Sequence, residues 1–249
     1  MFRGQAQRPA MPALQPSPRG AFLASLFLPL LHGPLLAETI TAARFADPTT
    51  RYTHGVLGDA VEWGTLEIEL QESGWQRAVL PQRLVFEDIA PRLWDLDADG
   101  APEVIVIEAD RDLGARLAIW GAEGRIAATP HIGQRNRWLA PVGAADLDGD
   151  GVTEIAFVDR PHLARVLRVW RYNEGRLTEV ASLEGFSNHR IGWDYIEGGV
   201  RDCGEGPELV LASGDWRFVM AVRLDDKGMN ARSLGDYSAA SLEAAIACR

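Results

Sequence analysis

The chain has few cysteines and none of the short motifs that mark common catalytic sites. Only two of its 249 residues are cysteine, and they form no CxxC pair of the kind that redox enzymes use. The sequence also lacks HExxH, GxSxG and Walker-type strings. No catalytic residue is therefore predicted, and a protein that is not an enzyme is the leading hypothesis.

An excess of positive charge is missing as well. The formal net charge is −10, while 47% of the residues are hydrophobic and 24% are charged, which is typical of a folded globular protein. An acidic surface repels phosphate backbones and anionic lipids. We therefore expect no nucleic acid and no membrane surface among the partners, whereas bound cations are compatible with this charge.

The first 37 residues differ from the rest because they contain no acidic residue. Their basic residues are Arg3, Arg8 and Arg19. An apolar run follows at 21–31, and Pro29 interrupts it well before the roughly 20 residues that a membrane span needs. This order predicts a signal peptide over 1–37 and an exported protein, periplasmic or secreted, with no stable membrane insertion after cleavage. An uncleaved anchor, and a true start at Met11, are the alternatives.

The two cysteines, Cys203 and Cys248, are expected to form a disulfide. An exported chain meets an oxidising compartment, where paired cysteines are the default. The bond would tie the C-terminal tail to the last part of the fold. Two separate thiols are the alternative.

A repeat of about fifty residues runs through the remaining chain. Asp95 and Asp146 each open a DLDxDGxxE string, and Trp120 and Trp170 follow at corresponding places. Each unit reads as four short strands separated by Gly-containing turns. The fold class predicted for 38–249 is all-β, a small β-propeller of about four four-stranded blades with a fifth as the alternative, and a short C-terminal helix. The units fall at about 51–85, 88–130, 139–183 and 195–234, and residues 38–50 could form a strand that closes the last blade.

The two Asp strings are predicted to bind calcium. In each string carboxylates stand at positions 1, 3, 5 and 9, Gly stands at position 6, and the carbonyl of position 7 is a further oxygen donor. The ligands expected are Asp95, Asp97, Asp99, Ala101 and Glu103 in the first loop, and Asp146, Asp148, Asp150, Val152 and Glu154 in the second. Without a cation these carboxylates would repel one another, and the strings contain no His or Cys that would favour zinc or copper. A plain Asp-Gly turn is the alternative, and the repetition in register argues against it.

These units resemble the FG-GAP or VCBS-type repeats of the integrin alpha-chain propeller family, whose calcium loops read DxDxDGxxD. The resemblance implies propeller blades with a Ca²⁺ ion in the loop between the first two strands, held by the ten residues named above. It covers two units well and two weakly. In both loops Glu replaces the usual last Asp, and the FG and GAP signatures themselves are largely missing. The resemblance supports the fold more than any particular function.

Three functions remain to be compared. The first is a non-catalytic binding or scaffold module for a protein or glycan partner, stiffened by calcium. The second is a hydrolase that uses channel-lining Asp and His, for which the candidates are His54 with Asp59, His131, His162 and His189. The third is a structural subunit of a larger assembly. A contiguous exposed aromatic patch on one propeller face would favour a glycan or protein binder, whereas a buried carboxylate and histidine in the central channel would favour catalysis.

Overall fold

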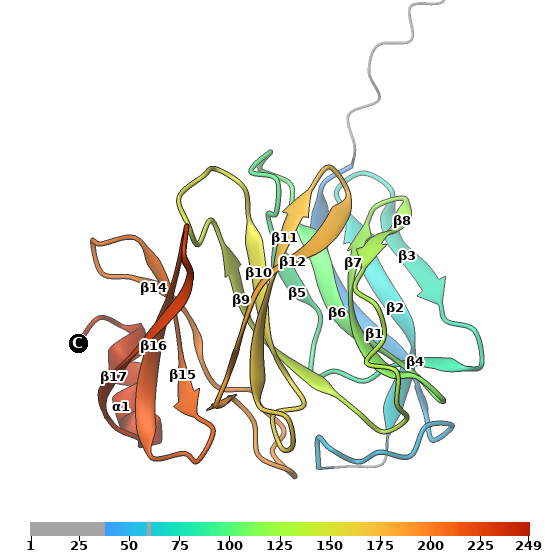
Figure 1. Cartoon of the computed structure of the whole chain (residues 1–249). Helices are drawn as coiled ribbons and strands as arrows, with labels where there is room; N and C mark the ends of the chain where they lie inside the picture. The colour runs from blue at the N-terminus through green and yellow to red at the C-terminus, as the bar shows by residue number, and fades with distance from the viewer. Residues whose placement is uncertain (1–37, 59–60) are drawn as a thin grey trace, which may run out of the picture. The chain divides into compact units, whose positions relative to one another are not determined.

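The computed structural model describes residues 38–58 and 61–249, which belong to one compact unit. The predicted signal peptide and Asp59 lie outside the described residues. The fold is all-β with one short helix, and its strands form three antiparallel sheets (Figure 1). The predicted fold class is confirmed at this level. No helix in the described part of the chain is long and apolar enough to cross a membrane.

The first sheet has eight strands and the order β1-β2-β4-β6-β7-β8, with β3 paired to β2 and β5 paired to β6. Its strands are β1 (Ile40–Thr49), β2 (Glu62–Leu70), β3 (Gly74–Val79), β4 (Leu84–Phe86), β5 (Arg92–Trp94), β6 (Glu103–Asp110), β7 (Gly114–Gly121) and β8 (Gly124–Ala128). The second sheet, in the order β12-β11-β10-β9, contains β9 (Leu139–Ala145), β10 (Glu154–Asp159), β11 (Val166–Asn173) and β12 (Arg176–Glu184).

The third sheet has five strands and the order β13-β15-β16-β17, with β14 paired to β15. Its strands are β13 (Phe186–Ser187), β14 (Gly199–Asp202), β15 (Pro207–Ser213), β16 (Phe218–Asp225) and β17 (Gly228–Asp236). The helix α1 (Ala239–Ile246) follows, with Ser238 and Ser241 forming a reciprocal N-terminal cap. The predicted C-terminal helix is therefore present.

The three sheets, of eight, four and five strands, differ from the four separate four-stranded sheets that the sequence predicts. Only the third unit forms an isolated four-stranded sheet. The first two units share one sheet, because β4 pairs both with β2, through Trp63 and Phe86, and with β6. The cause is a break in the first strand of the second unit. Residues 87–91 interrupt it, so that β4 and β5 lie end to end along one edge of β6. In the fourth unit β13 and β14 lie along β15 in the same way.

Residues 38–50 do not join the last unit, so the expectation that they close the last blade is wrong. They form β1, which pairs with β2 in a ladder from Ile40 opposite Leu70 to Thr49 opposite Glu62. A strand that pairs with its neighbour in sequence closes a short loop, which costs less chain entropy than reaching the far end of the domain.

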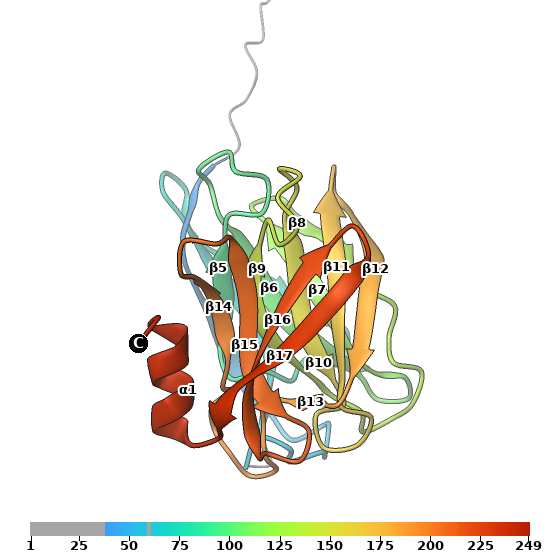
Figure 2. The ribbon, with the colours of Figure 1, turned by 60° about the vertical axis from the view of Figure 1, so that its left-hand side comes forward.

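The strict alternation of side chains along a strand gives each central strand two cores. In β6, Val104 and Val106 face the first unit, while Ile105 and Ile107 face the second sheet. All eight residues of β6 are buried. In the same manner β10 lies between the cores on either side of the second sheet, and β15 lies between the second sheet and α1. Figure 2 shows α1 packed beside the third sheet.

The tryptophans at corresponding places in the repeat pack in these cores. Trp120 is 9% exposed and contacts Phe86 edge to face. Trp170 is half-buried and packs against the core between the first two sheets. The outcome supports a packing role rather than a ligand-binding role for both.

Candidate metal centre

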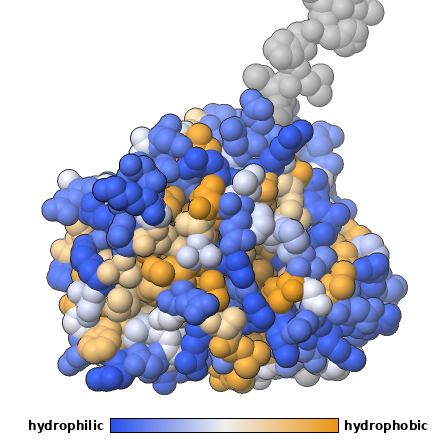
Figure 3. All heavy atoms as spheres, in the orientation of Figure 1, coloured by the Kyte–Doolittle hydropathy of each residue, from blue (hydrophilic) through white to orange (hydrophobic). Residues whose placement is uncertain are grey.

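Three loops lead into the second strand of a unit, and they lie along the same edge of the molecule, at the top of Figure 1. We name them by unit. The second-unit loop joins β5 to β6, the third-unit loop joins β9 to β10, and the fourth-unit loop joins β14 to β15. The face shown in Figure 3 is largely hydrophilic near this edge.

The second-unit and third-unit loops share most of their internal hydrogen bonds. The first Asp of each loop accepts the N–H of the sixth residue, at 3.0 Å from Gly100 to Asp95 and 2.9 Å from Gly151 to Asp146. The fifth residue accepts the N–H of the seventh in the same way, at 2.7 Å in Asp99 and 2.9 Å in Asp150. These bonds bend each loop back on itself, so its carboxylates stay on the inner side of the turn.

The Glu that ends each string fixes the loop to the core. Glu103 accepts the N–H of Leu96 at 3.0 Å, and Glu154 accepts that of Leu147 at 2.9 Å. The two leucines are only 1% and 4% exposed and pack in the cores, away from the carboxylates. Each Glu is a backbone acceptor as well as a candidate ligand.

Position 4 of the loop is a feature that the sequence analysis missed. Both loops need a left-handed backbone there as well as at the Gly of position 6. The third-unit loop supplies Gly149 with φ of 80°, whereas the second-unit loop places Ala98 at φ of 59°. A residue with a Cβ is strained in this conformation.

The second-unit loop gathers three carboxylates without any nearby positive side chain among the contacts described. Asp95, Asp97 and Asp99 bring ligand atoms within 4.8 Å of one another. Burial raises the pKa of Glu103, and the charges of Asp97 and Asp99 raise it further. Burial and the charges of Glu103, Asp97 and Asp99 also raise the pKa of Tyr172, which reaches this loop from β11. An all-oxygen donor set with uncompensated charge fits a hard divalent cation.

The third-unit loop contains its own positive charge. Asp146, Asp148 and Glu154 come within 4.8 Å of one another, and Arg171 from β11 forms ion pairs with members of the loop. Its guanidinium nitrogens lie 2.5 Å from Asp148, 3.1 Å from Asp150 and 2.7 Å from Glu154. Burial and the Asp148 charge raise the pKa of Glu154, and Arg171 counters them. This donor set does not fit a cation unless Arg171 moves away.

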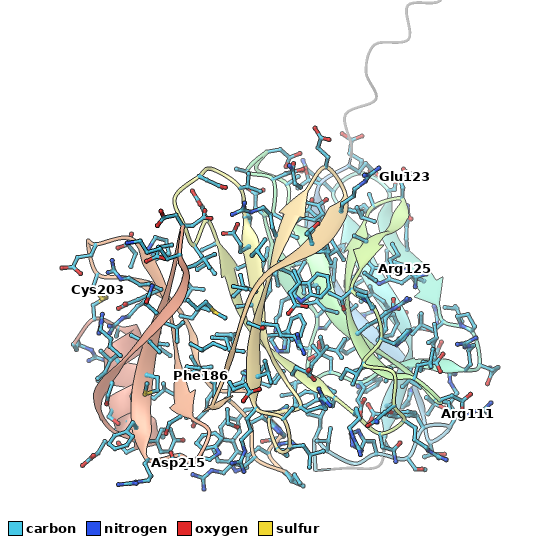
Figure 4. All side chains as sticks on the ribbon, viewed as in Figure 1. Arg111, Glu123, Arg125, Phe186, Cys203 and Asp215 are labelled. Carbon is cyan, nitrogen blue, oxygen red and sulfur yellow. A yellow bond between two sulfur atoms is a disulfide. The ribbon has the colours of Figure 1, made fainter. Side chains whose placement is uncertain are left out.

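The fourth-unit loop lacks the Asp series and is held by other contacts. Cys203 and Cys248 form a disulfide that ties the loop to the end of α1, as predicted (Figure 4). Burial would raise the pKa of Glu208, but ion pairs with Arg201, Arg223 and Arg232 hold it below its usual value.

A buried Glu–His pair lies away from the loops, and the sequence analysis identified only its histidine. Glu87 is fully buried, and one of its carboxyl oxygens lies 2.5 Å from Nδ1 of His54. Burial raises the pKa of Glu87 well above its usual value and lowers that of His54, which favours the neutral forms of both. A cavity of about 30 Å³ lies beside His54. It has room for a water molecule.

The other candidate histidines are held by structural contacts. His162 and His189 share a hydrogen bond of 2.9 Å, and burial together with His189 lowers the pKa of His162 to about 4. His131 donates from Nδ1 to the carbonyl of Gly114 at 2.7 Å. The predicted pairing of His54 with Asp59 falls outside the described residues.

An aromatic surface lies near the end of the third sheet opposite Cys203, the end where Figure 4 labels Asp215. Its members are Arg190, Trp193, Tyr195, Trp216 and Tyr237, and we call it the aromatic surface below. Trp193 and Tyr195 stack at 4.5 Å, and the Arg190 guanidinium lies 4.4 Å from the Trp216 ring centre. Tyr195 is 46% exposed, and Trp216 has a φ of 60°, an uncommon conformation for a bulky residue.

Together the fold and loops define an all-β repeat protein with acidic loops at a shared edge. Residues 95–157 match the family model of an FG-GAP-like repeat, which spans the second-unit loop, β6 to β9, the third-unit loop and the start of β10. The chain therefore carries an FG-GAP-type repeat, as the Asp strings predicted. Comparison with curated proteins gives no significant match.

Proposed function

We propose that this protein is an exported, calcium-binding β-propeller-type module with a non-catalytic binding or scaffold role. The observation that carries the proposal is the second-unit loop, where three aspartates converge and no positive side chain among the described contacts compensates them. The FG-GAP-like match over 95–157 supports the same function.

The strand arrangement supports propeller-type units. In the second, third and fourth units the chain forms first, second, third and fourth strands in sequence, each hydrogen-bonded to the next. Successive sheets pack face to face through shared cores. This is the way in which blades of a propeller pack, and a loop between the first and second strands is the place where FG-GAP-type repeats carry their cation.

Calcium would neutralise the second-unit loop and fix its turn. The residues that would hold it are Asp95, Asp97, Asp99 and Glu103, with the carbonyl of Ala101 as a further oxygen. Glu103 already accepts the Leu96 N–H, so its other oxygen is the one free to face the ion. A rigid loop at the edge of a sheet gives the module a surface of fixed shape. The loop itself is not the surface proposed to bind a partner.

The aromatic surface supports a protein or glycan partner. Partly exposed aromatic side chains that are held by stacking and by a guanidinium supply contact area at low entropic cost. Ile191 beside it is 71% exposed. Export is supported by the composition of residues 1–37 and by the disulfide, which persists in oxidising compartments.

Thermal unfolding in calcium and in chelator tests the proposal. For a dissociation constant of about 10⁻⁴ to 10⁻³ M, about 10 mM calcium stabilises the protein by about 1.4–2.7 kcal/mol. That corresponds to a rise in Tm of about 3–10 °C for a chain of this size. We expect Asp97→Asn to remove the rise and Asp112→Asn, an exposed turn residue at the other end of β6, to leave it intact. A Tm that calcium does not change would refute the proposal.

A further inference from the structure

Arg171 lies directly opposite the Glu that ends the third-unit loop. The β10–β11 ladder pairs Glu154 with Arg171, and the side chain extends from there into the loop. It contacts Glu154, Asp148 and Asp150 within 3.1 Å. The guanidinium therefore occupies the position between carboxylates where a bound cation would have to lie.

The remaining oxygens of this loop are largely used by the backbone. Asp146 accepts the N–H groups of Gly149 and Asp150 on one oxygen and that of Gly151 on the other. The second oxygen of Glu154 accepts the Leu147 N–H. With Arg171 in place, one internal positive charge pairs with three of the four carboxylates of the loop, and most of their oxygens already accept a hydrogen bond.

The same position differs between units in a way that matches the loops. Continuing the β6–β7 register by one residue sets Gly121 opposite Glu103, and continuing the β15–β16 register sets Arg223 opposite Glu208. The fourth-unit loop has no Asp series, so Arg223 pairs with Glu208 there without any connection to a metal. An arginine at this position is thus a structural partner of the closing Glu. Gly121 is the position where that partner is missing.

We propose that Arg171 takes the place of a cation in the third-unit loop, so that the chain binds one calcium ion, in the second-unit loop, and not two. This inference rests on the proposed function for the second-unit loop and goes beyond it. The guanidinium repels a divalent ion at close range and competes for the same carboxylates. The third-unit loop therefore holds an internal guanidinium in the place where the second-unit loop would hold a cation.

Counting bound calcium in the full chain tests the inference, by equilibrium dialysis against about 1–5 mM radiolabelled calcium. We expect one ion in the native protein, two in Arg171→Ala, and one in the matched control Arg223→Ala. In the native background, Asp97→Asn removes the single ion and Asp148→Asn retains it. Arg171→Gln, which keeps most of the side-chain volume and an amide donor, is the second test variant, and circular dichroism verifies that each variant is folded.

The outcomes separate the two proposals. Two ions in the native protein, or no additional ion in either Arg171 variant, would overturn the role of Arg171. A single native ion that survives Asp97→Asn and is lost in Asp148→Asn would overturn it as well. No ion in the native protein but one in Arg171→Ala would refute the second-unit site while supporting the role of Arg171.

Discussion

The second-unit and third-unit loops have nearly the same sequence and share most of their hydrogen bonds, yet only the third-unit loop has a basic side chain among its carboxylates. DLDADGAPE contains no basic residue and has Gly121 across from its closing Glu, whereas DLDGDGVTE has Arg171 there. The nine residues of a loop therefore do not determine its charge environment by themselves. The residue opposite the closing Glu, on the neighbouring strand, contributes to it as well.

The fourth-unit loop extends the comparison. Its Glu208 lies among three arginines, and a disulfide joins the loop to the C-terminal end of the chain. The same corner of the repeat is thus held in three ways: by a proposed calcium ion, by an internal guanidinium, and by a covalent bond with ion pairs. Each can be removed separately.

Removing the disulfide should have the largest effect. Cys203→Ser with Cys248→Ser opens a link between residues 45 apart, and the chain-entropy model gives a loss of about 4 kcal/mol in the free energy of unfolding. Urea unfolding measures the loss, and the reduced native protein is the control. We expect the same loss with and without calcium. A loss that calcium restores would place a metal site in the fourth unit, where we expect none.

Removing Arg171 should have the next largest effect, and only when calcium is absent. Arg171→Ala leaves Glu154 buried without its partner, which we expect to cost about 2–3 kcal/mol in chelator, less than a fully buried pair because Arg171 is 28% exposed. Urea unfolding in calcium should recover part of the loss. Equal losses in calcium and chelator would mean that the vacated loop does not accept the ion.

Introducing an arginine opposite Glu103 should make the second-unit loop behave like the third. A Cβ at Gly121 would come within 2.9 Å of the end of the Ile126 side chain, which can move, so the substitution is tolerable. We expect Gly121→Arg to abolish the calcium-dependent stabilisation of about 1.4–2.7 kcal/mol. Gly121→Ala adds the Cβ without the charge and should retain it. If both variants still respond to calcium in a thermal melt, the charge opposite the Glu is not what separates the loops.

The smallest effect should come from the strained position 4. Ala98→Gly relieves the left-handed conformation of an alanine and should raise the free energy of unfolding by about 1 kcal/mol, and Gly149→Ala should lower it by a similar amount. Neither change should alter how much calcium is bound. Denaturant unfolding in chelator measures both, and opposite signs are the required result.

The sequence predicts the repeated part of this fold well because the same features recur in each unit at the same spacing. The Asp strings, the buried strand β6 after Glu103 and the tryptophans at 120 and 170 all recur with one period. The partner of β1 could not be predicted, because alternating residues 40–49 would fit any open sheet edge. Glu87 was missed because it lies in a break between β4 and β5 that the repeat does not include.

Arg171 was missed although a signal was present. Trp120 and Trp170 correspond to each other, so the next residues, Gly121 and Arg171, also correspond. That Arg171 lies opposite Glu154 becomes known only from the ladder between the second and third strands of the unit. Strand register is a tertiary property, and composition or spacing within a loop does not contain it.

The most direct test is anomalous X-ray diffraction from crystals of the native protein grown in calcium. We expect one calcium peak, among Asp95, Asp97 and Asp99, with the Arg171 guanidinium still between Asp148 and Glu154. A calcium peak in the third-unit loop with Arg171 turned away from it would refute the proposed role of Arg171.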